Sequence, residues 1–437
     1  MNILELKRKV CQEIDKNSEK IIGLAKQVAQ HPEMGYKEQK TSRAVKDFFK
    51  EIELKYQDNL AITGVKAKLK EASSGPNVAV LGELDAVLCP DSPFADPATG
   101  AAHACGHHLQ LGAMLGAALG LKLSGIGDQL AGNVTFMAVP AEEYVEIAYR
   151  MKLREEGKIH YLGGKQELIY RGVFDDIDMA MMIHSQKESP EPAVIMGDSS
   201  NGFIGKTIQY LGKEAHAAEA PSEGINALNA AMLGLMGVHA LRETFRDNDI
   251  VRVHPIITKG GDLVNSVPAD VRMETYVRAK TMNAIDATHI KVDRALRAGG
   301  DAVGAKTIIK TLPGYLPLDC PKAFNDLFLA NASQFVTPEN IKHAGHFGGS
   351  TDMGDVSHII PTIHPYIGGV IGALHTRDFK VADYNAACVL PAKLMAMTVI
   401  DLLADNAAHA NSILKAFQPV MTKEEYIKKL DGYFAEE

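Results

Sequence analysis

Apolar and polar residues alternate along the first 200 positions in a way that predicts helices packed on a sheet. Apolar residues recur at helical spacing through the first 50 positions, and residues 77–87 then form a Val-, Ala- and Leu-rich run typical of a buried strand. A helix is predicted from His107 to about Ser124, with two more buried strands at 132–139 and 176–185. Strands that alternate with helices in this order favour an α/β fold with a mostly parallel sheet.

The pattern changes at about residue 201, which indicates a second domain. From there the chain predicts strand, helix, two strands, helix and strand, the order of a ferredoxin-like α+β fold. After residue 313 a helix, a glycine-rich loop and a long helix return to the first pattern. We therefore expect an α/β domain in two parts, 1–200 and 314–437, with an inserted domain at 201–313. The expected elements of the inserted domain are 206–211, 225–245, 251–258, 271–278, 283–298 and 306–312.

Composition and charge narrow the classes of function. The 437 residues include 46 Lys and Arg against 54 Asp and Glu, a formal net charge of −8, and 46% of them are hydrophobic. That apolar content suffices for a packed core, and the acidic balance disfavours a protein that binds nucleic acid through phosphate contacts. We take 111–121 as the longest apolar stretch; it is shorter than the roughly 20 residues of a spanning helix, so no membrane association is expected.

The N-terminus and the cysteines favour a cytoplasmic location. The first 16 residues mix charges with short apolar steps and lack the apolar core and cleavage site of a signal peptide. The cysteines are odd in number and scattered, which suits a reducing compartment better than a disulfide framework. They are Cys11, Cys89, Cys105, Cys320 and Cys388.

Four clusters of metal-ligating side chains lie at predicted strand ends or on glycine-flanked loops. Thiolate, imidazole and carboxylate groups together are the ligands of zinc and similar divalent ions. Carboxyl ends of parallel strands meet at one edge of a sheet, where buried carboxylates and imidazoles are costly without a cation. Each residue taken singly also suits an ordinary structural role, but their shared placement predicts a metal site. The clusters are His103, Cys105, His107 and His108; Glu142 and Glu143; His184; and His375.

A site of this kind suits the hydrolysis of an amide. Two metal ions can bind the carbonyl oxygen and hold a hydroxide, while a carboxylate that is not a ligand transfers the proton. Glu142 and Glu143 are adjacent, so one is available as base and the other as ligand. Two alternatives use the same residues: a thiol amidase with Cys105 as nucleophile and His107 or His108 as base, and a metal-binding regulator without catalysis. The presence of Glu142 argues against the regulator.

Motifs spread over nearly the whole chain resemble those of a known family. The segments HPEMGYKE, GELDA, HACGH, PAEE, GKEAHAA and GGSTDMGDVS occur in this order and are followed by His375. With this set the chain resembles the aminoacylase and glutamate-carboxypeptidase family of dinuclear metallopeptidases, clan MH, in its amidohydrolase branch. The segment STDMGDVSHIIPTIHPY is similar to p-aminobenzoyl-glutamate hydrolases and to β-alanyl-dipeptide-cleaving relatives of aminoacylase. The resemblance implies a zinc-exopeptidase-like catalytic domain with an inserted lid and dimerisation domain.

The resemblance also implies two divalent metal ions per subunit, zinc or manganese, with cobalt and nickel as alternatives. It implies that Cys105 bridges the two ions. His107 and His184 would bind one ion, and Glu143 and His375 would bind the other. The substrate would be a small N-acyl amino acid or a dipeptide with a free carboxylate.

Further roles follow from the resemblance by position. Glu142 would be the general base and acid, and Asp85 would orient a histidine ligand. His216 would reach the active site of the partner subunit in a homodimer formed through the lid domain and stabilise the oxyanion. Asn265 and Arg278 would hold the carboxylate end of the substrate.

Three features depart from the family pattern. His108 stands where the branch usually has Asp or Asn after HACGH, and Thr351 stands where its Gly-Ser-Glu-Asp motif has Glu. Residues 144–165 are a charged connection that we interpret as an insertion near the mouth of the site. These departures bear on the substrate and the metal preference more than on the reaction class.

Overall fold

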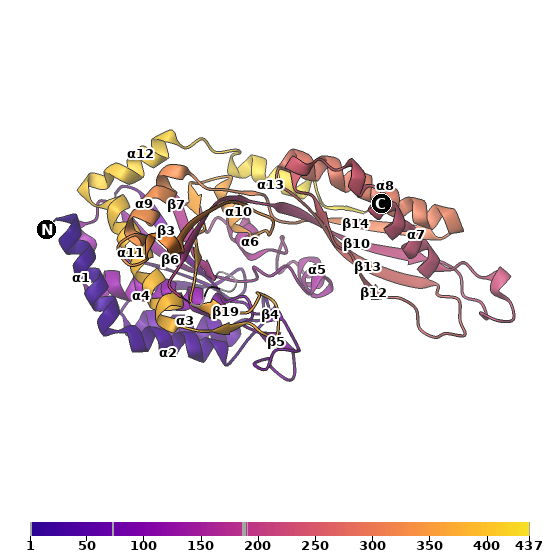
Figure 1. Cartoon of the computed structure of the whole chain (residues 1–437), viewed down its shortest axis with the longest axis horizontal. Coiled ribbons are helices and arrows are strands. Elements are labelled where there is room, and N and C mark those ends of the chain that lie inside the picture. Colours follow the sequence, from indigo (N-terminus) through magenta and orange to yellow (C-terminus); the bar gives the residue numbers. More distant parts are fainter. Residues whose placement is uncertain (1, 72–73, 186–188, 190, 437) are drawn as a thin grey trace. The chain divides into compact units, whose positions relative to one another are not determined.

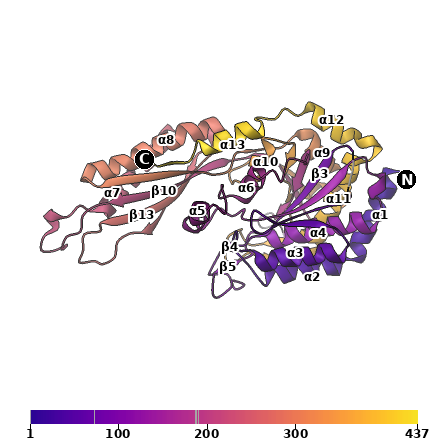
Figure 2. The ribbon, with the colours of Figure 1, turned by 180° about the vertical axis from the view of Figure 1, so that it is seen from behind.

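The computed structural model describes residues 2–71, 74–185, 189 and 191–436, and the chain divides into two compact units (Figures 1 and 2). Unit 1 comprises Met1–Ser199, Asp319–His346 and Asp355–Thr422, and unit 2 comprises Ser200–Leu318, Phe347–Gly354 and Lys423–Glu437. The chain passes between the units five times, once between Thr422 and Lys423 and four times within an element. The four elements are β9 (Val194–Ser200), β15 (Leu318–Asp319), β16 (Ile341–Phe347) and α10 (Met353–Ser357).

The central sheet of unit 1 has the strand order β1-β2-β6-β3-β7-β17. The part from β6 to β17 is parallel, as the buried strands predicted, and its central strands β3 and β6 are buried along their whole length. The antiparallel hairpin β1–β2, which the sequence pattern did not indicate, extends the sheet beside β6, so the sheet is mixed. The strands are β1 (Tyr56–Leu60), β2 (Gly64–Lys68), β3 (Asn77–Glu83), β6 (Asn133–Val139), β7 (Met179–Met182) and β17 (Thr362–Ile363).

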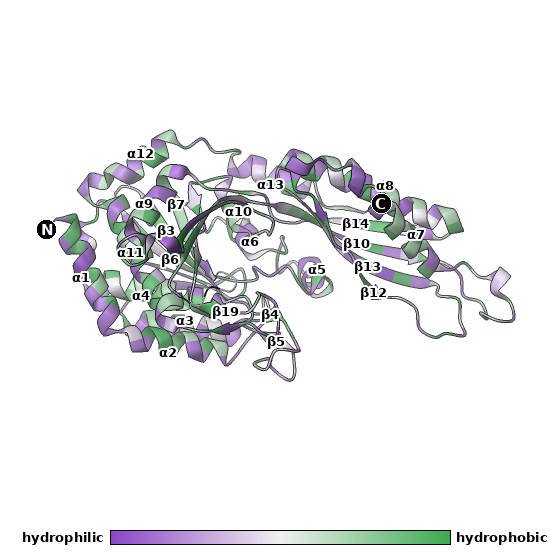
Figure 3. Ribbon diagram, viewed as in Figure 1, coloured by the Kyte–Doolittle hydropathy of each residue, from purple (hydrophilic) through white to green (hydrophobic). Residues whose placement is uncertain are grey.

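Helices pack on this sheet, with the buried helix α4 (His107–Leu123) in contact with β3 and with α1, α2 and α11. Glycines four residues apart on α4 let these neighbours approach closely: an added Cβ at Gly112 would lie 2.3 Å from Cys388 Sγ, and one at Gly120 would lie 2.5 Å from Ile14. In Figure 3 both colours alternate along α1 and α12, as expected for helices with one apolar face. The other helices of unit 1 are α1 (Ile3–Lys16), α2 (Ser18–Ala29), α3 (Gln39–Glu51), α5 (Ile147–Glu155), α6 (Gly164–Tyr170), α9 (Lys322–Ala332), α11 (Leu390–Leu403) and α12 (Ala408–Ala416).

The C-terminal core helix corrects one expectation from the sequence. Asn385–Leu403 is 19 residues long with a mean hydropathy of 1.8, so by length and composition it could cross a membrane, and 111–121 is not the longest apolar stretch. Because 89% of its apolar window is buried within the protein, the segment occupies the place of a core helix.

Unit 2 is an antiparallel sheet in the order β11-β13-β10-β14-β21, with β12 also paired to β13. Helices α7 and α8 pack against each other and against this sheet. The predicted strand 251–258 is split into β11 and β12, and the predicted helix 225–245 is shorter because a 3₁₀ turn follows it. The elements are β10 (Gly202–Leu211), α7 (Ala227–Ala240), β11 (Arg252–Val253), β12 (Ile256–Lys259), β13 (Asp270–Ala279), α8 (Met282–Val303) and β14 (Lys306–Pro313).

The end of the chain differs from the predicted division, which placed all of 314–437 with the α/β domain. Residues 423–437 belong to unit 2, where α13 (Lys423–Asp431) is followed by β21 (Ala435–Glu436). Strand β21 pairs with β14, and Lys429 Nζ and Tyr433 Oη both donate to Asp286, at 2.7 and 2.6 Å. These partners lie more than 100 positions away in the sequence, so local periodicity could not indicate them.

Candidate metal centre

The loop that precedes α4 places Cys105 and His107 at the start of that helix. Gly106 adopts a left-handed backbone conformation with φ 88°, and an added Cβ there would lie 2.2 Å from Ser185 Oγ. Glycine is therefore required at this position, both for the turn and for the close approach of β8 (His184–Ser185). As a result, the Cys105 thiol and the His107 imidazole lie beside His184 of β8.

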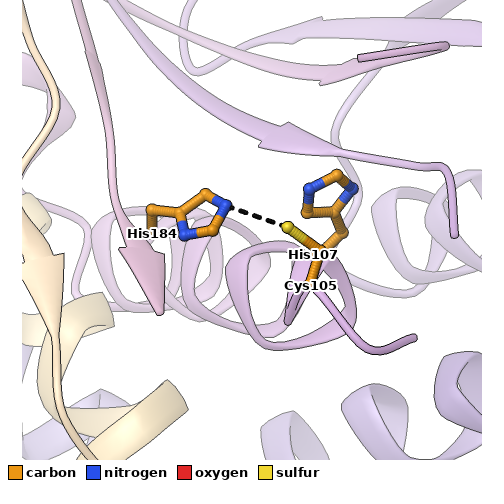
Figure 4. A group of neighbouring side chains, drawn as sticks. All are labelled: Cys105, His107 and His184. Atoms are coloured by element: carbon orange, nitrogen blue, oxygen red, sulfur yellow. Dashed lines mark hydrogen bonds between the residues drawn. The ribbon is translucent and has the colours of Figure 1, made fainter. Parts of the chain in front are cut away.

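Cys105, His107 and His184 form the first group of candidate ligands (Figure 4). Their ligand atoms lie within 4.8 Å of one another, and Cys105 Sγ is 3.3 Å from His184 Nε2. Each histidine directs Nδ1 at a carbonyl oxygen, His107 at Asp85 O at 2.8 Å and His184 at Ser185 O at 3.0 Å. Because a carbonyl only accepts, Nδ1 carries the proton and Nε2 is left as the atom for an ion.

Cys105 also belongs to a second group, with Glu143 and His375, whose ligand atoms likewise lie within 4.8 Å of one another. His375 Nε2 is 3.2 Å from Cys105 Sγ and 3.0 Å from Glu143 Oε1. The backbone of His375 has φ 60° and its N–H donates to Ala104 O at 2.9 Å, which turns the ring toward the thiol. One sulfur is thus shared by two groups of ligands, as the assignment of Cys105 to a bridging position requires.

A third group joins Glu83, His107 and Glu142. His107 Nε2 is 3.1 Å from Glu83 Oε2 and 3.9 Å from Glu142 Oε2. Glu83 also accepts from Lys165 Nζ at 2.6 Å, and both of these side chains are fully buried. The sequence marked Glu83 only as a carboxylate at a strand end, and it gave no signal for Lys165.

Asp85 links the two Cys105 groups. Its Oδ2 accepts from the backbone N–H of Glu143 at 2.8 Å, and its Oδ1 is 3.3 Å from His107 Nδ1. This buried carboxylate therefore touches one candidate ligand from each group, which is the geometry expected of a residue that orients ligands.

The charges of the centre are strongly coupled. Burial and the Glu143 carboxylate raise the pKa of the Cys105 thiol, but His184, His375 and His107 together lower it to about 6. The Glu143 and Cys105 anions raise the pKa of His375 to about 12. Burial raises the pKa of Glu143, but the opposing effect of His375 is larger and the pKa falls to about 2. Without a cation the site therefore holds anions balanced by imidazolium, and an ion would replace those protons.

The residues fit divalent ions. Asp85 Oδ1, His107 Nε2 and Glu143 Oε1 are buried and have no hydrogen-bond partner in the part of the chain that the structure describes. His107 Nε2 and Glu143 Oε1 nevertheless lie 3.1 and 3.0 Å from other candidate ligand atoms. Buried ligand atoms that lie close together without making hydrogen bonds are expected where a metal ion is their common partner.

His103 and His108 lie beside the centre. Their rings are 5.2 Å apart, and burial lowers the pKa of both, that of His108 to about 3. His108 is therefore a neutral imidazole packed on His103. The Cys105 sulfur contacts His184 and His375 at 3.3 and 3.2 Å and also interacts with His107, so these contacts leave the thiol-amidase alternative with His107 as base open.

The remaining predicted site residues belong to unit 2. His216 is exposed, and its Nδ1 accepts from the N–H groups of Ala218 and Glu219 at 3.3 and 3.1 Å, which leaves the proton on Nε2. Asn265 is exposed on the neighbouring segment, where its carbonyl accepts from Ala217 N–H at 2.9 Å. Arg278 is half-buried and its Nε donates to His254 Nε2 at 3.0 Å. The functional roles of these three residues stay predictions.

Known proteins are similar to this chain over most of its length. The sequence model of "Peptidase family M20/M25/M40" matches residues 79–397. The chain is 30% identical over 420 residues to the Xaa-Arg dipeptidase of Mus musculus, covering 91% of this chain and 89% of that relative. It is 27% identical to one subunit of the p-aminobenzoyl-glutamate hydrolase of Escherichia coli, covering 77% of this chain and 66% of that relative.

Solved structures share the fold. A dinuclear metal-binding peptidase of the M20 family from Bacillus subtilis matches with a TM-score of 0.64 at 21% identity, covering 88% of this chain and 98% of that one. The aminobenzoyl-glutamate utilization protein from Klebsiella pneumoniae matches with a TM-score of 0.66 at 16% identity, covering 89% of this chain and 97% of that one.

Proposed function

This chain belongs to peptidase family M20/M25/M40, a family of metal-dependent hydrolases of carbon–nitrogen bonds, and on that premise we propose that it cleaves the amide bond of a small dipeptide or N-acyl amino acid. The observation that carries the proposal is the shared thiolate. Cys105 belongs at once to a group with His107 and His184 and to a group with Glu143 and His375.

Two divalent ions would be held by these groups, one by each, with Cys105 between them. When bound, such a pair supplies Lewis-acid activation of the amide carbonyl and of water at neutral pH. Thiolate and imidazole favour zinc, and the carboxylate also accommodates manganese, cobalt or nickel. His107 Nε2 and Glu143 Oε1, which are buried and make no hydrogen bond among the described residues, support this assignment.

Glu142 would move the protons. It lies in neither of the two Cys105 groups, yet its Oε2 is 3.9 Å from His107 Nε2 and its side chain is largely buried. A carboxylate that lies beside the ligands but is not needed as one can accept a proton from the attacking water and deliver it to the leaving amine nitrogen. Glu143 and Asp85 would keep the ligand and orienting roles that the resemblance implies.

We propose that the substrate has a free carboxylate. The first candidate is a dipeptide of the Xaa-Arg class. The 30% identity to the mouse Xaa-Arg dipeptidase over 91% of this chain supports that class. An aminobenzoyl-glutamate-like substrate is the second candidate, supported by a 27% identity over 77% of the chain.

We propose that the protein is a cytoplasmic homodimer. In unit 2, His216 would reach the active site of the partner subunit, and Asn265 and Arg278 would hold the carboxylate end of the substrate. The protonated Nε2 of His216 supports a donor role toward the developing oxyanion, because its Nδ1 is already occupied by two backbone N–H groups.

The proposal is tested by hydrolysis and metal content together. Chelated protein is reloaded with zinc, manganese, cobalt or nickel and assayed with Xaa-Arg dipeptides, β-alanyl dipeptides, p-aminobenzoyl-glutamate and N-acetyl amino acids. Glu142→Gln should retain two metal equivalents while turnover falls by roughly 100-fold or more, the scale of a lost general base. The matched control is Glu146→Gln, a nearby carboxylate that pairs with Lys37 at 2.7 Å; it should keep wild-type turnover.

Two outcomes would overturn the proposal. Full turnover in chelated protein, lost on alkylation of Cys105, would indicate the thiol amidase. Tight binding of two ions without hydrolysis of any substrate class would indicate a metal-binding homologue that lacks catalysis.

A further inference from the structure

The segment 144–165 contains a buried arginine, although it was expected only as a charged insertion. Arg150, on α5, is 1% exposed, whereas Lys152 on the same helix is exposed. Arginine is almost never fully buried without partners, because burying an unpaired guanidinium is costly. The groups that it contacts therefore identify what its burial stabilises.

The guanidinium of Arg150 donates to backbone carbonyls on both sides of Glu142. Nη2 donates to Glu143 O, and Nη1 donates to Leu162 O at 2.7 Å and to Ala141 O at 3.3 Å. Its Cζ lies 5.5 Å from the centre of the Tyr36 ring, within range of a cation–π contact. The rigid fork of arginine supplies several donors at fixed angles, so one side chain can fix several carbonyls at once.

Buried carboxylates accept hydrogen bonds from the backbone N–H groups of Ala141 and Glu143, the two residues whose carbonyls contact Arg150. The N–H of Ala141 donates to Glu38 Oε1 at 2.8 Å, and the N–H of Glu143 donates to Asp85 Oδ2 at 2.8 Å. Ala141 has φ 54°, a left-handed conformation that an alanine rarely adopts and that persists only where the surroundings enforce it. Both neighbours of Glu142 are thus held at their N–H by a carboxylate and at their C=O by Arg150.

We propose that Arg150 is a positioning residue for the proposed base Glu142 and the proposed ligand Glu143. It fixes the backbone on either side of the base through the carbonyls of Ala141 and Glu143. The proposal rests on the function proposed above, but it concerns a residue that acts through backbone carbonyls and not through a candidate ligand atom.

Gly35, in the HPEMGYKE motif, offers a second way to disturb this contact. An added Cβ at Gly35 would lie 2.4 Å from Arg150 Nη2 and 2.9 Å from Ala141 Cα. Gly35→Ala would therefore displace the guanidinium or the Ala141 backbone without removing any charge.

The test compares Arg150→Met, Arg150→Lys and Gly35→Ala with the wild type. The matched control is Arg154→Met, on the same helix, whose Nε donates to His160 O at 3.0 Å, away from the Glu142-Glu143 backbone. Three measurements are made on each purified protein. Zinc affinity is measured by competition with a chelator, and kcat and KM are measured with a dipeptide substrate. Amide hydrogen exchange over 141–145 is measured in the metal-free state.

We expect Arg150→Met to lower zinc affinity and kcat roughly 10- to 100-fold, the scale of lost outer-shell support, with KM nearly unchanged. Arg150→Lys should lie between wild type and Arg150→Met, since one ammonium retains the charge but cannot reach all three carbonyls. Exchange over 141–145 should quicken in Arg150→Met and Gly35→Ala, and Arg154→Met should match the wild type in every measurement.

The inference is overturned if folded Arg150→Met keeps wild-type zinc affinity, kcat and exchange. If Arg150→Met does not fold, wild-type values in both Arg150→Lys and Gly35→Ala overturn it instead. Wild-type protein that binds none of zinc, manganese, cobalt and nickel would refute the proposed function, yet faster exchange over 141–145 in the variants would still support the positioning role. Failure of one proposal is therefore distinguishable from failure of the other.

Discussion

The buried ion pair between Lys165 and Glu83 lies beside His107 of the candidate metal centre and can be broken by one substitution. Lys165 Nζ lies 2.6 Å from Glu83 Oε1, and both side chains are fully buried. The other carboxylate oxygen accepts from Gln110 Nε2 at 2.9 Å and is 3.1 Å from His107 Nε2. Burial raises the pKa of Glu83, but Lys165 and the histidines lower it further, well below its usual range. Lys165→Met would leave this carboxylate charged and without its ammonium.

The expected loss follows from the partners that remain. Removing one member of a buried pair costs about 3–5 kcal/mol, because the other charge is left uncompensated. Gln110 still donates to Glu83 in the variant, so we expect the lower end, about 3 kcal/mol. At about 2 °C per kcal/mol for a large domain, the thermal midpoint of unit 1 should fall by about 6 °C.

The assay is thermal unfolding of chelated protein at pH 7, followed by calorimetry so that the two units are separated. Lys158→Met is the matched control, since Lys158 lies in the same segment but is exposed and pairs with Glu156 on the surface. The double variant Lys165→Met with Glu83→Gln should recover most of the lost stability, because the carboxylate that Lys165 paired with is then no longer charged. A midpoint shift below about 2 °C in Lys165→Met, or a double variant less stable than the single one, would refute the reasoning.

The remaining predictions concern the thiol, the histidine of unit 2 and acid pH. With the other four cysteines substituted, Cys105 should be alkylated much more slowly in the metal-loaded than in the chelated protein, because a coordinated thiolate is a poor nucleophile; equal rates would show that the thiol is not a ligand. His216→Ala should lower kcat roughly 100- to 1000-fold with metal content intact. If His216 acts across a homodimer, mixing His216→Ala subunits with Glu142→Gln subunits should restore activity. A mixture that stays inactive after verified subunit exchange would exclude action across the dimer. Burial raises the pKa of Asp293, but His289 and Lys206 lower it below its usual range, so its contribution to folding is complete above about pH 4 and is lost as the pH falls. Asp293→Asn should therefore flatten the loss of stability of unit 2 in an acid titration followed by circular dichroism, and an unchanged slope would contradict this.

The sequence by itself determined the main elements of the fold and the types of side chain at the candidate site. The buried runs around 77–87 and 132–139 became β3 and β6, and the glycine before His107 became the turn that starts α4. These features are readable because strand and helix periodicity, and the demand for glycine at positive φ, depend on neighbours a few positions away. The ligand types at strand ends were also visible, since a parallel sheet brings its carboxyl ends together.

Only the tertiary structure decided which residues meet and what supports them. Cys105 and His375 are 270 positions apart, yet they contact each other, and Arg150 and Lys165 are buried although the pattern of their segment is merely charged. The apolar segment Asn385–Leu403 likewise became a core helix rather than a membrane span, and the C-terminal strand β21 paired with β14 of unit 2. Contacts of this range are set by how whole elements pack and by the need to satisfy every buried charge, and neither leaves a local pattern in the sequence.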